Sequence, residues 1–134
     1  MKKILIVTAN YYKDISLGLL NSAKKNLPRN FNIKIIKVPG VFEIPVTISK
    51  HLKKFDAFIA LGCVIKGQTP HFHYLCTSVI NALTNLSVEF KKPIGNGILT
   101  CNNKKQAIVR ADPKIKNKGG EATEAAIAVY NIIK

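Results

Sequence analysis

Apolar and polar positions follow one another in blocks along this chain, and the blocks change between strand-like and helix-like periods. The longest apolar block runs from Ala57 to Ile65, a length and composition typical of a strand buried on both faces of a parallel sheet. Lys3 to Ala9 is short, apolar and β-branched and also predicts a strand. Asn32 to Val38 and residues 93–100 predict two more, which gives a sheet of about four strands.

Segments with the apolar spacing of helices lie between these strands. The predicted helices run from about Ile15 to Leu27, Pro45 to Leu52, Phe72 to Phe90, Lys104 to Ala111 and Glu121 to Ile133. Asp14 or Ser16 is expected to cap the first helix, and Asn102 or Asn103 the fourth. Strand and helix alternate throughout, so the predicted fold is α/β with a parallel sheet. Ligands of such sheets bind outside the C-terminal strand ends, where the connecting loops converge.

Length and composition favour one folded domain that covers residues 1–134. An apolar fraction of 47% and a mean hydropathy of +0.10 argue against disorder. No apolar run approaches the roughly 20 residues of a membrane-spanning helix, and the opening MKKILIVTAN lacks a small-residue cleavage site. We therefore expect a cytoplasmic protein without a membrane partner. The three cysteines form no disulfide framework, and Cys63 in the apolar strand is expected to be a buried thiol.

The net charge of +14 is large for a chain of 134 residues. A basic surface is one way to bind nucleic acid. The alternative is a lysine-rich chain whose side chains are solvated and attract small anionic substrates. The lysines stand singly or in pairs, and no aromatic–basic motif of an RNA-binding module is present. The second reading is favoured, so no nucleic-acid partner is expected.

The segment from Lys66 to His71 is the strongest candidate for a site. Thr69 can cap a helix, Pro70 fits its first position, and His71 falls in its first turn. Backbone N–H groups at a helix start lack partners within the helix and can hold an anion, with Lys66 and Gln68 close by. An imidazole there could exchange protons near neutral pH. The plainer alternative for His71 is an exposed side chain with a local hydrogen bond.

Other candidates are scattered through the loops and helix ends. Arg110 is one of two arginines, and its planar fork suits phosphate; alone, it would be read as a solvated residue. Glu43, between two prolines, is either a helix cap or an acceptor for a polar ligand. Tyr11 follows the first strand and could stack on a flat ring, or simply lie at a rim. Lys118 marks a helix entry that Glu121 would stabilise.

Several kinds of chemistry have no motif in the chain. There is no glycine-rich phosphate loop, so no nucleotide cofactor is indicated. There is also no serine–histidine–acid motif and no histidine cluster for a metal. Catalysis would therefore rest on positioning, proton transfer and anion binding.

Five segments, in order and at the right spacing, resemble the lumazine synthase (6,7-dimethyl-8-ribityllumazine synthase) family. They are VPGVFEIP (38–45), LGCVIKGQTPHFHY (61–74), PIGNGILT (93–100), QAIVRA (106–111) and NKGGEA (117–122). The resemblance implies a flavodoxin-like three-layer α/β/α sandwich. It also implies condensation of 5-amino-6-(D-ribitylamino)uracil with 3,4-dihydroxy-2-butanone 4-phosphate, the penultimate step of riboflavin biosynthesis. That reaction releases phosphate and needs no cofactor or metal. A homopentamer with active sites at subunit interfaces is implied as well.

The resemblance also implies a role for each candidate residue. His71 matches the proton-transfer histidine, and Gln68, Thr69 and Arg110 match the phosphate site. Lys118 and Glu121 match a supporting polar pair. Positions that match the pyrimidine and ribityl site are Tyr11, Val41, Phe42, Glu43, Cys63, Val64, Ile65 and Asn96.

Two of these positions depart from the family's usual residues. Tyr11 stands where phenylalanine or tryptophan is usual, which should preserve stacking. Asn96 stands where many members have phenylalanine, which alters the pocket wall. Two other hypotheses remain beside the enzyme: a basic nucleic-acid-binding module and a non-catalytic flavin or lumazine carrier.

Overall fold

The computed structural model describes residues 2–134 and shows one sheet of four parallel strands. The strands are β1 (Lys2–Ala9), β2 (Phe31–Val38), β3 (Ala57–Ile65) and β4 (Ile94–Cys101), in the spatial order β2-β1-β3-β4. The predicted parallel sheet is confirmed, with strand boundaries displaced by at most two residues. Ala57–Ile65 is central, as its composition predicted, because β1 and β4 pair with its two edges.

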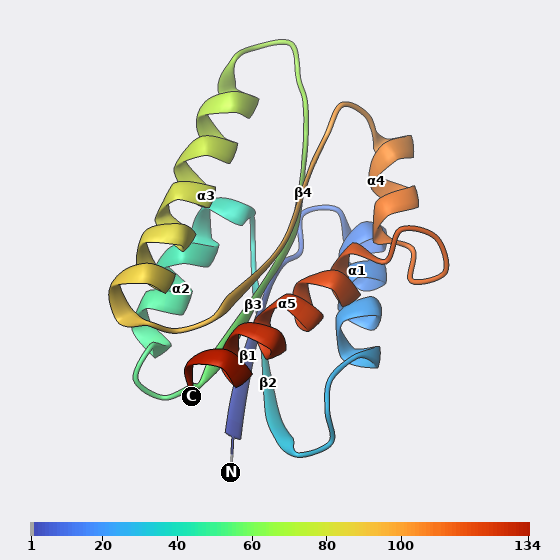
Figure 1. Cartoon of the computed structure of the whole chain (residues 1–134). Coiled ribbons are helices and arrows are strands. Elements are labelled where there is room, and N and C mark those ends of the chain that lie inside the picture. Colours follow the sequence, from blue (N-terminus) through green and yellow to red (C-terminus); the bar gives the residue numbers. More distant parts are fainter. Residues whose placement is uncertain (1) are drawn as a thin grey trace.

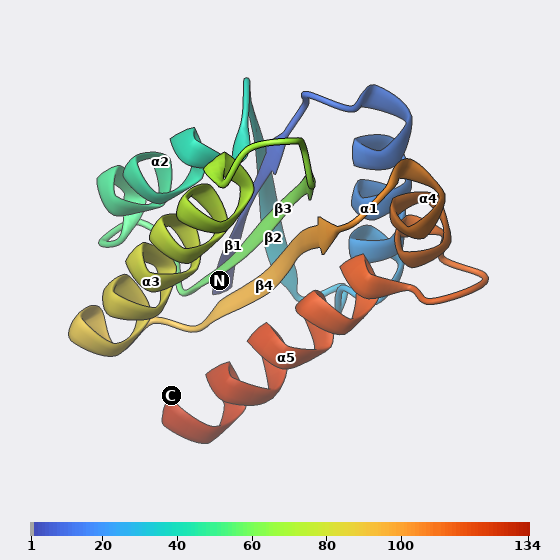
Figure 2. The same ribbon diagram turned by 90° about the horizontal axis from the view of Figure 1, so that it is seen from above.

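Helices cover both faces of this sheet, which makes three layers (Figure 1). The short turn η1 (Val41–Glu43), α2 (Ile44–His51) and α3 (His71–Phe90) lie on one face. The other face carries α1 (Lys13–Lys25), α4 (Lys104–Ala111) and α5 (Lys118–Ile133). Figure 2 shows the two helical layers on opposite sides of the strands. The three-layer α/β/α arrangement is therefore confirmed.

Two hydrophobic cores explain why β1 and β3 have no polar alternation. Ile4 and Ile6 pack under α1 and α5, whereas Leu5 and Val7 pack under α2 and α3. A strand buried on both faces needs apolar residues at every position. Each large aliphatic side chain buried in this way contributes about 1.5–3 kcal/mol. By contrast, β2 lies at the edge of the sheet and exposes most of its side chains.

Helix starts differ in detail from the sequence prediction. Neither Asp14 nor Ser16 caps α1, which begins earlier, after Tyr12; the Ser16 hydroxyl instead donates to the Ala9 carbonyl at 2.6 Å. Asn103 does cap α4, since its side-chain oxygen accepts from Gln106 N at 2.9 Å. The third helix begins at His71, with Pro70 as the preceding cap residue rather than its first helical residue.

The last helix begins at Lys118, three residues before the predicted Glu121. Gly119 and Gly120 suggest a turn, yet both lie inside α5. A Cβ at Gly119 would overlap the Leu19 carbonyl of α1, so only glycine allows the two helices this approach. Tertiary packing thus outweighs the low helix propensity of glycine, which destabilises a helix by about 1 kcal/mol per residue relative to alanine.

Glycines of β4 allow the same helix to approach the sheet. A Cβ at Gly95 would overlap the backbone carbonyl of Ala122 in α5, and one at Gly97 would overlap the Leu61 side chain. Glycines within a strand often mark a close approach of backbone to a ligand or a neighbour, and at Gly95 and Gly97 the neighbours are other segments of this protein.

We predict that Gly95→Ala lowers the free energy of unfolding by about 1–3 kcal/mol, because the added methyl group meets fixed backbone rather than a movable side chain. Gly67→Ala is the matched control, since a Cβ there has no atom within 4 Å, and its effect should stay within about 0.5 kcal/mol. Urea denaturation of both variants measures the difference. Equal stability of the two variants would contradict the packing argument.

Candidate active site

The strand order places a topological switch point between β1 and β3. The chain passes from β1 outward to β2 and returns to the other side of β1 to form β3. Loops that leave adjacent strands in opposite directions open a crevice at the C-terminal strand ends, where α/β proteins bind ligands. Tyr11 follows β1, the segment with Val41 and Phe42 follows β2, and Lys66 to Pro70 follows β3.

Beyond the end of β1, strand β3 has an open backbone edge. Pairing with β1 ends at Leu61, whereas pairing with β4 continues to Ile65. Lys66 N donates to Cys101 O, and Phe58 N donates to Pro93 O, so the even-numbered backbone groups of β3 bond to β4. The polar backbone groups of Cys63 and Ile65 therefore turn toward the side where β1 has ended. A flat heterocycle with polar edges would find donors and acceptors there.

Tyr11 is well placed beside this edge to contact a ring. Its side chain is 73% exposed, and its ring meets that of Tyr12 edge-on at 4.9 Å between centroids. Tyr12 packs against the core below it, and burial raises the pKa of its hydroxyl, with further contributions from Tyr11 and Cys63. One tyrosine thus anchors the loop while the other presents its face to solvent.

The turn η1 presents one apolar side chain and holds a carboxylate. Val41 is buried, whereas Phe42 is 66% exposed. Glu43 Oε1 accepts from Gly40 N at 2.9 Å, so this carboxylate closes the turn after Pro39. That contact is the capping role predicted as one alternative. Glu43 also lines a cavity of about 380 Å³ with Phe42 and Val46, which leaves room for a ligand on the same side.

His71 lies at the start of α3, opposite η1. The whole turn from Lys66 to His71 is exposed, and Thr69 Oγ1 accepts from His71 N at 3.4 Å. His71 lines a cavity of about 420 Å³ together with Gly40, Val41, Phe42, Tyr74, Leu75 and Ser78. The histidine and the segment predicted to hold the ribityl chain therefore face the same space. His73, on another face of the helix, is exposed as well.

A second group of predicted residues gathers around Arg110. A cavity of about 180 Å³ is lined by Asn96, Gly97, Ile98, Leu99, Thr100, Arg110 and Lys118. Arg110 donates to the Gln106 carbonyl at 3.3 Å, and Lys118 Nζ lies 3.0 Å from Glu121 Oε2. Two cations with one shared opening form a site suited to a small anion.

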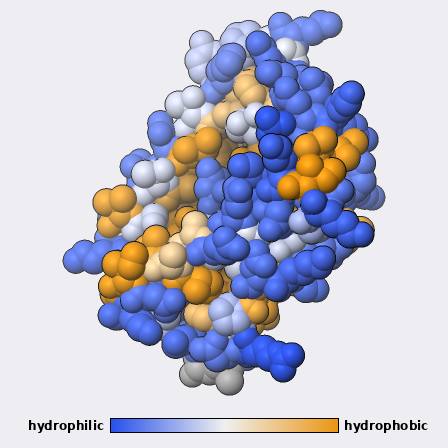
Figure 3. Space-filling model, turned by 45° about the vertical axis from the view of Figure 1, so that its right-hand side comes forward, coloured by the Kyte–Doolittle hydropathy of each residue, from blue (hydrophilic) through white to orange (hydrophobic). Residues whose placement is uncertain are grey.

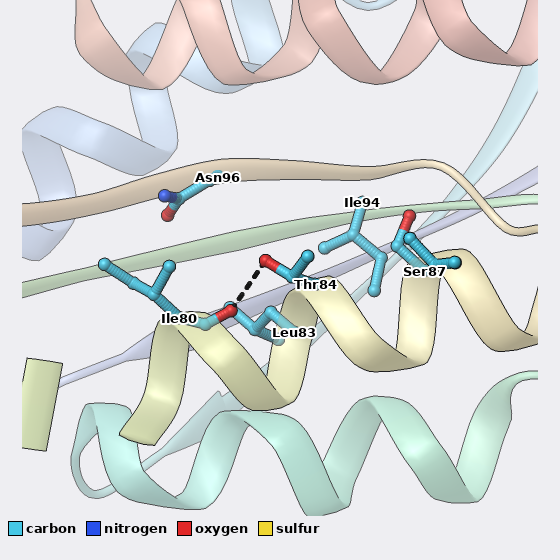
Figure 4. Close-up of a pocket in the computed structure, with 7 residues that line it drawn as sticks. Ile80, Leu83, Thr84, Ser87, Ile94 and Asn96 are labelled. Carbon is cyan, nitrogen blue, oxygen red and sulfur yellow. Dashed lines mark hydrogen bonds between the residues drawn. The ribbon is translucent and has the colours of Figure 1, made fainter. Parts of the chain in front are cut away.

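Asn96 lies on the outer edge of β4. Its Oδ1 accepts from Ile98 N at 3.0 Å, which leaves the amide N–H groups available. It also lines a second cavity, where Figure 4 shows it across from Ile80 and Leu83 of α3, with the Thr84 hydroxyl bonded to the Ile80 carbonyl at 2.9 Å.

The two groups are separate in a single chain. The cavities around His71 and Arg110 have no lining residue in common. His71 belongs to the α2–α3 layer and Arg110 to the α1–α4–α5 layer, on opposite faces of the sheet (Figure 2). The family resemblance implies one phosphate site with Gln68, Thr69 and Arg110. In a single chain Arg110 lines one cavity, whereas Gln68 and Thr69 lie in the exposed turn before His71 and line neither of these two cavities.

Comparison with known proteins gives a clear result. The family model for 6,7-dimethyl-8-ribityllumazine synthase matches residues 1–134. The chain is 42% identical to the enzyme of that name from Zymomonas mobilis, over all of this chain and 98% of that protein. It is 43% identical to the one from Buchnera aphidicola, with 98% of this chain and 87% of that protein covered. Identity to the Corynebacterium kroppenstedtii enzyme is 40%, with 98% and 85% covered.

The chain belongs to the 6,7-dimethyl-8-ribityllumazine synthase family. The predicted family is thereby confirmed, and with it the predicted activity of a transferase in riboflavin biosynthesis. Lumazine synthase activity involves two small-molecule substrates. Within residues 2–134 no helix is long and apolar enough to cross a bilayer. Nor do these residues bring three or more histidine, cysteine, aspartate or glutamate side chains together as a metal site.

Sequence reasoning missed two residues at the candidate lumazine synthase site. Tyr74 is 71% exposed and lines the His71 cavity, and Ser78 lines the same cavity. Both follow His71 at intervals of three and seven residues, which places all three on one helix face. That spacing was the available signal.

Cys63 is buried, as predicted, and its thiol faces the core rather than the crevice. Burial, with the adjacent Cys101 thiol, raises the pKa of Cys63 to about 12. We predict that iodoacetamide at about pH 8 leaves Cys63 unmodified in the folded protein, because only roughly one thiol in 10⁴ is ionised. Half-buried Cys76 is the internal control and should react first. Peptide mass spectrometry measures both, and alkylation of Cys63 as fast as Cys76 would contradict this assignment.

Proposed function

We propose that the chain makes 6,7-dimethyl-8-ribityllumazine in sites formed between neighbouring copies, with His71 from one copy and Arg110 from the next. The observation that supports this is the separation of the proton-transfer and anion-binding residues in two cavities on opposite layers of one chain. The substrates are 5-amino-6-(D-ribitylamino)uracil and 3,4-dihydroxy-2-butanone 4-phosphate. Residues 1–134 act as one domain in this role.

The pyrimidine substrate binds over the open edge of β3. Its ring stacks on Tyr11, and its polar edge meets the backbone groups of Cys63 and Ile65, with Val64 between them. The ribityl chain extends along Val41, Phe42 and Glu43, where backbone turns and one carboxylate provide hydrogen-bond partners. Tyr11 supplies a broad exposed face, and stacked aromatic pairs contribute about 0.5–1.5 kcal/mol beyond the area that they bury.

The phosphate substrate binds between the two layers of adjacent copies. Gln68, Thr69 and the N-terminal end of α3 approach it from one copy. Arg110 and Lys118 approach it from the other, with Asn96 at the wall and Glu121 holding the lysine. Charge-assisted hydrogen bonds of this kind are about twice as strong as neutral ones.

The reaction needs no nucleophile from the protein, because the amine of the pyrimidine substrate attacks the ketone. Imine formation releases water and requires protons to move between nitrogen and oxygen. His71 carries these protons, since its ring is exposed to the cavity that holds both reacting groups. Arg110 stabilises the negative charge on the phosphate as it leaves. No cofactor and no metal take part in this scheme.

Such a site implies a ring of copies. The surface around His71 differs from that around Arg110, so the contact that joins them is head-to-tail, and a closing head-to-tail contact forms a ring. A homopentamer is the ring that the family resemblance implies. Exposed apolar side chains are available for the contact, including Phe42, Val46, Tyr74, Val88 and Phe90. Figure 3 shows apolar patches set among hydrophilic surface on the face that it displays.

The enzyme is proposed to work in the cytoplasm, and neither nucleic acid nor a membrane is a partner. The three free cysteines are consistent with a reducing compartment. The +14 charge attracts the anionic phosphate substrate.

We predict that wild-type protein converts the two substrates to a product with lumazine absorbance and fluorescence. His71→Ala should lower kcat by roughly 10²-fold, the lower end of the range for general acid–base catalysis, with little change in KM. Arg110→Ala should chiefly raise KM for the phosphate substrate, because it removes a charge-assisted contact. Steady-state kinetics on each variant measures these changes in kcat and KM. Folded wild-type protein that binds substrates without turnover would favour the carrier hypothesis, and salt-sensitive RNA binding without turnover the nucleic-acid hypothesis.

A mixing experiment tests whether neighbouring copies share each site. The assay uses a phosphate-substrate concentration far below the raised KM of Arg110→Ala, so that each variant alone is nearly inactive. Co-refolding equal amounts of the His71→Ala and Arg110→Ala variants should then restore about one quarter of wild-type activity, because one in four neighbouring pairs combines an intact His71 with an intact Arg110. Light scattering on the same sample should give the mass of a pentamer. No gain over the separate variants would show that each site lies within one chain, and a monomeric mass would reject the ring.

A further inference from the structure

A buried polar contact fixes the start of α5 against α1. Ser22 of α1 is fully buried, and its hydroxyl donates to Asn117 Oδ1 and accepts from Gly120 N at 2.9 Å. Asn117 stands immediately before α5 with a φ of 50°, in the left-handed region. Asparagine tolerates that conformation better than most residues. The hydrogen bond from Ser22 holds the side chain of Asn117 in a defined position.

Close packing against α1 fixes the position of the first turn of α5. A Cβ at Gly119 would overlap the Leu19 carbonyl, and a Cβ at Gly120 would overlap the Asn117 side chain. The first turn of α5 therefore lies directly on α1, with no space for a side chain between them. Any shift of Asn117 must carry the residue that follows it, Lys118.

The loop before Asn117 bonds back to the helix that carries Arg110. Asn117 N donates to Asp112 O at 2.9 Å, and Lys116 N donates to Val109 O at 3.3 Å. The seven residues from Ala111 to Asn117 thus form a closed connection between the two cations of the anion cavity. One end of that connection is the C-terminal end of α4, and the other is the contact with Ser22.

The ion pair of Lys118 cannot supply this positioning by itself. Lys118 and Glu121 are both substantially exposed, with 42% and 55% of their side-chain surfaces accessible. Exposed pairs contribute little and exchange readily with solvent. The backbone of Lys118 is fixed through its neighbour, Asn117.

We propose that Ser22 and Asn117 are positioning residues for the phosphate substrate. Their buried hydrogen bond sets the backbone of Lys118 so that its ammonium group and the Arg110 guanidinium reach the same phosphate group. This inference rests on the proposed function, because it takes Arg110 and Lys118 as the phosphate-binding cations. Neither Ser22 nor Asn117 contacts substrate in this scheme.

The test compares Ser22→Ala with Thr123→Val in the full-length protein. Thr123 is also fully buried, and its hydroxyl donates to the Ala23 carbonyl at 2.9 Å across the same pair of helices. Its other hydrogen bond goes to the Gly119 carbonyl, so neither of the two involves Asn117. Both variants lose a buried hydrogen bond between α1 and α5, so similar decreases in Tm are expected. Only Ser22→Ala should raise KM for 3,4-dihydroxy-2-butanone 4-phosphate, by roughly five- to tenfold, with KM for the pyrimidine substrate unchanged.

Two variants of Asn117 distinguish the effect of its backbone conformation from the effect of its hydrogen bond with Ser22. Asn117→Gly accepts the positive φ without strain but cannot accept from Ser22, so it should raise the same KM as Ser22→Ala. Asn117→Asp keeps the acceptor oxygen and should preserve a KM near that of the wild type. These two variants decide the question if Ser22→Ala does not fold.

Several outcomes would overturn the inference. Equal KM changes in Ser22→Ala and Thr123→Val would mean that loss of stability alone is responsible. A raised KM in Lys118→Ala with no change in Ser22→Ala and Asn117→Gly would reject the positioning role but leave the proposed function intact. Unchanged KM in both Lys118→Ala and Arg110→Ala would reject the phosphate site, and the positioning role with it.

Discussion

Burial of β3 between β1 and β4 is the constraint on which the rest of this structure depends. Its residues from Ala57 to Val64 are all buried, so the strand can occupy only a central position covered on both faces. That position delivers the turn from Lys66 to His71 to the C-terminal edge of the sheet. Lys66 N also bonds to Cys101 O, which ties the same turn to the end of β4 and so to the helix of Arg110. The turn with His71 thus follows β3 directly, and the segment with Arg110 is tied to that turn through the end of β4.

Glycine provides the second constraint, since it brings α5 close to β4 and α1 at once. Gly95 on the strand and Gly119 on the helix lie where a Cβ would meet a backbone carbonyl. Close packing of this kind has few alternatives, because backbone atoms cannot move aside as a flexible side chain can. Lys118, at the start of α5, therefore has a fixed backbone despite its exposed side chain.

The reaction class suits a protein with these properties. When a substrate amine attacks a substrate ketone, the protein must hold two ligands together, move protons and bind phosphate, and orientation can supply much of the rate enhancement. Rigid strands and closely packed helices meet that demand better than mobile loops. His71 and the cations Arg110 and Lys118 lie on opposite layers, which gives each chain two different surfaces, and the proposed ring of copies would bring them together.

Short-range patterns in the sequence predicted the elements and most candidate residues. Continuous apolar runs predicted β1 and β3, because strands buried on both faces need no polar positions. His71 was located by the local chemistry of the turn that precedes it, and Arg110 and Lys118 by motifs that resemble a known family. Residue type predicted Asn102 or Asn103 as a helix cap, and Asn103 takes this role by accepting from a backbone group three residues away. All these features depend on residues close together in the chain, which is why they could be predicted.

The strand order, the start of α5 and the grouping of the site residues became apparent once the elements were packed together. Gly119 and Gly120 suggest a loop until α1 is seen to require their lack of side chains. The 71% exposure of Tyr74 depends on how α3 is placed on the sheet, with that side of the helix outward. Ser22 carried no signal at all, because its partners Asn117 and Gly120 lie 95 and 98 residues away. Contacts between distant segments follow from how whole elements pack, and local pattern does not encode that packing.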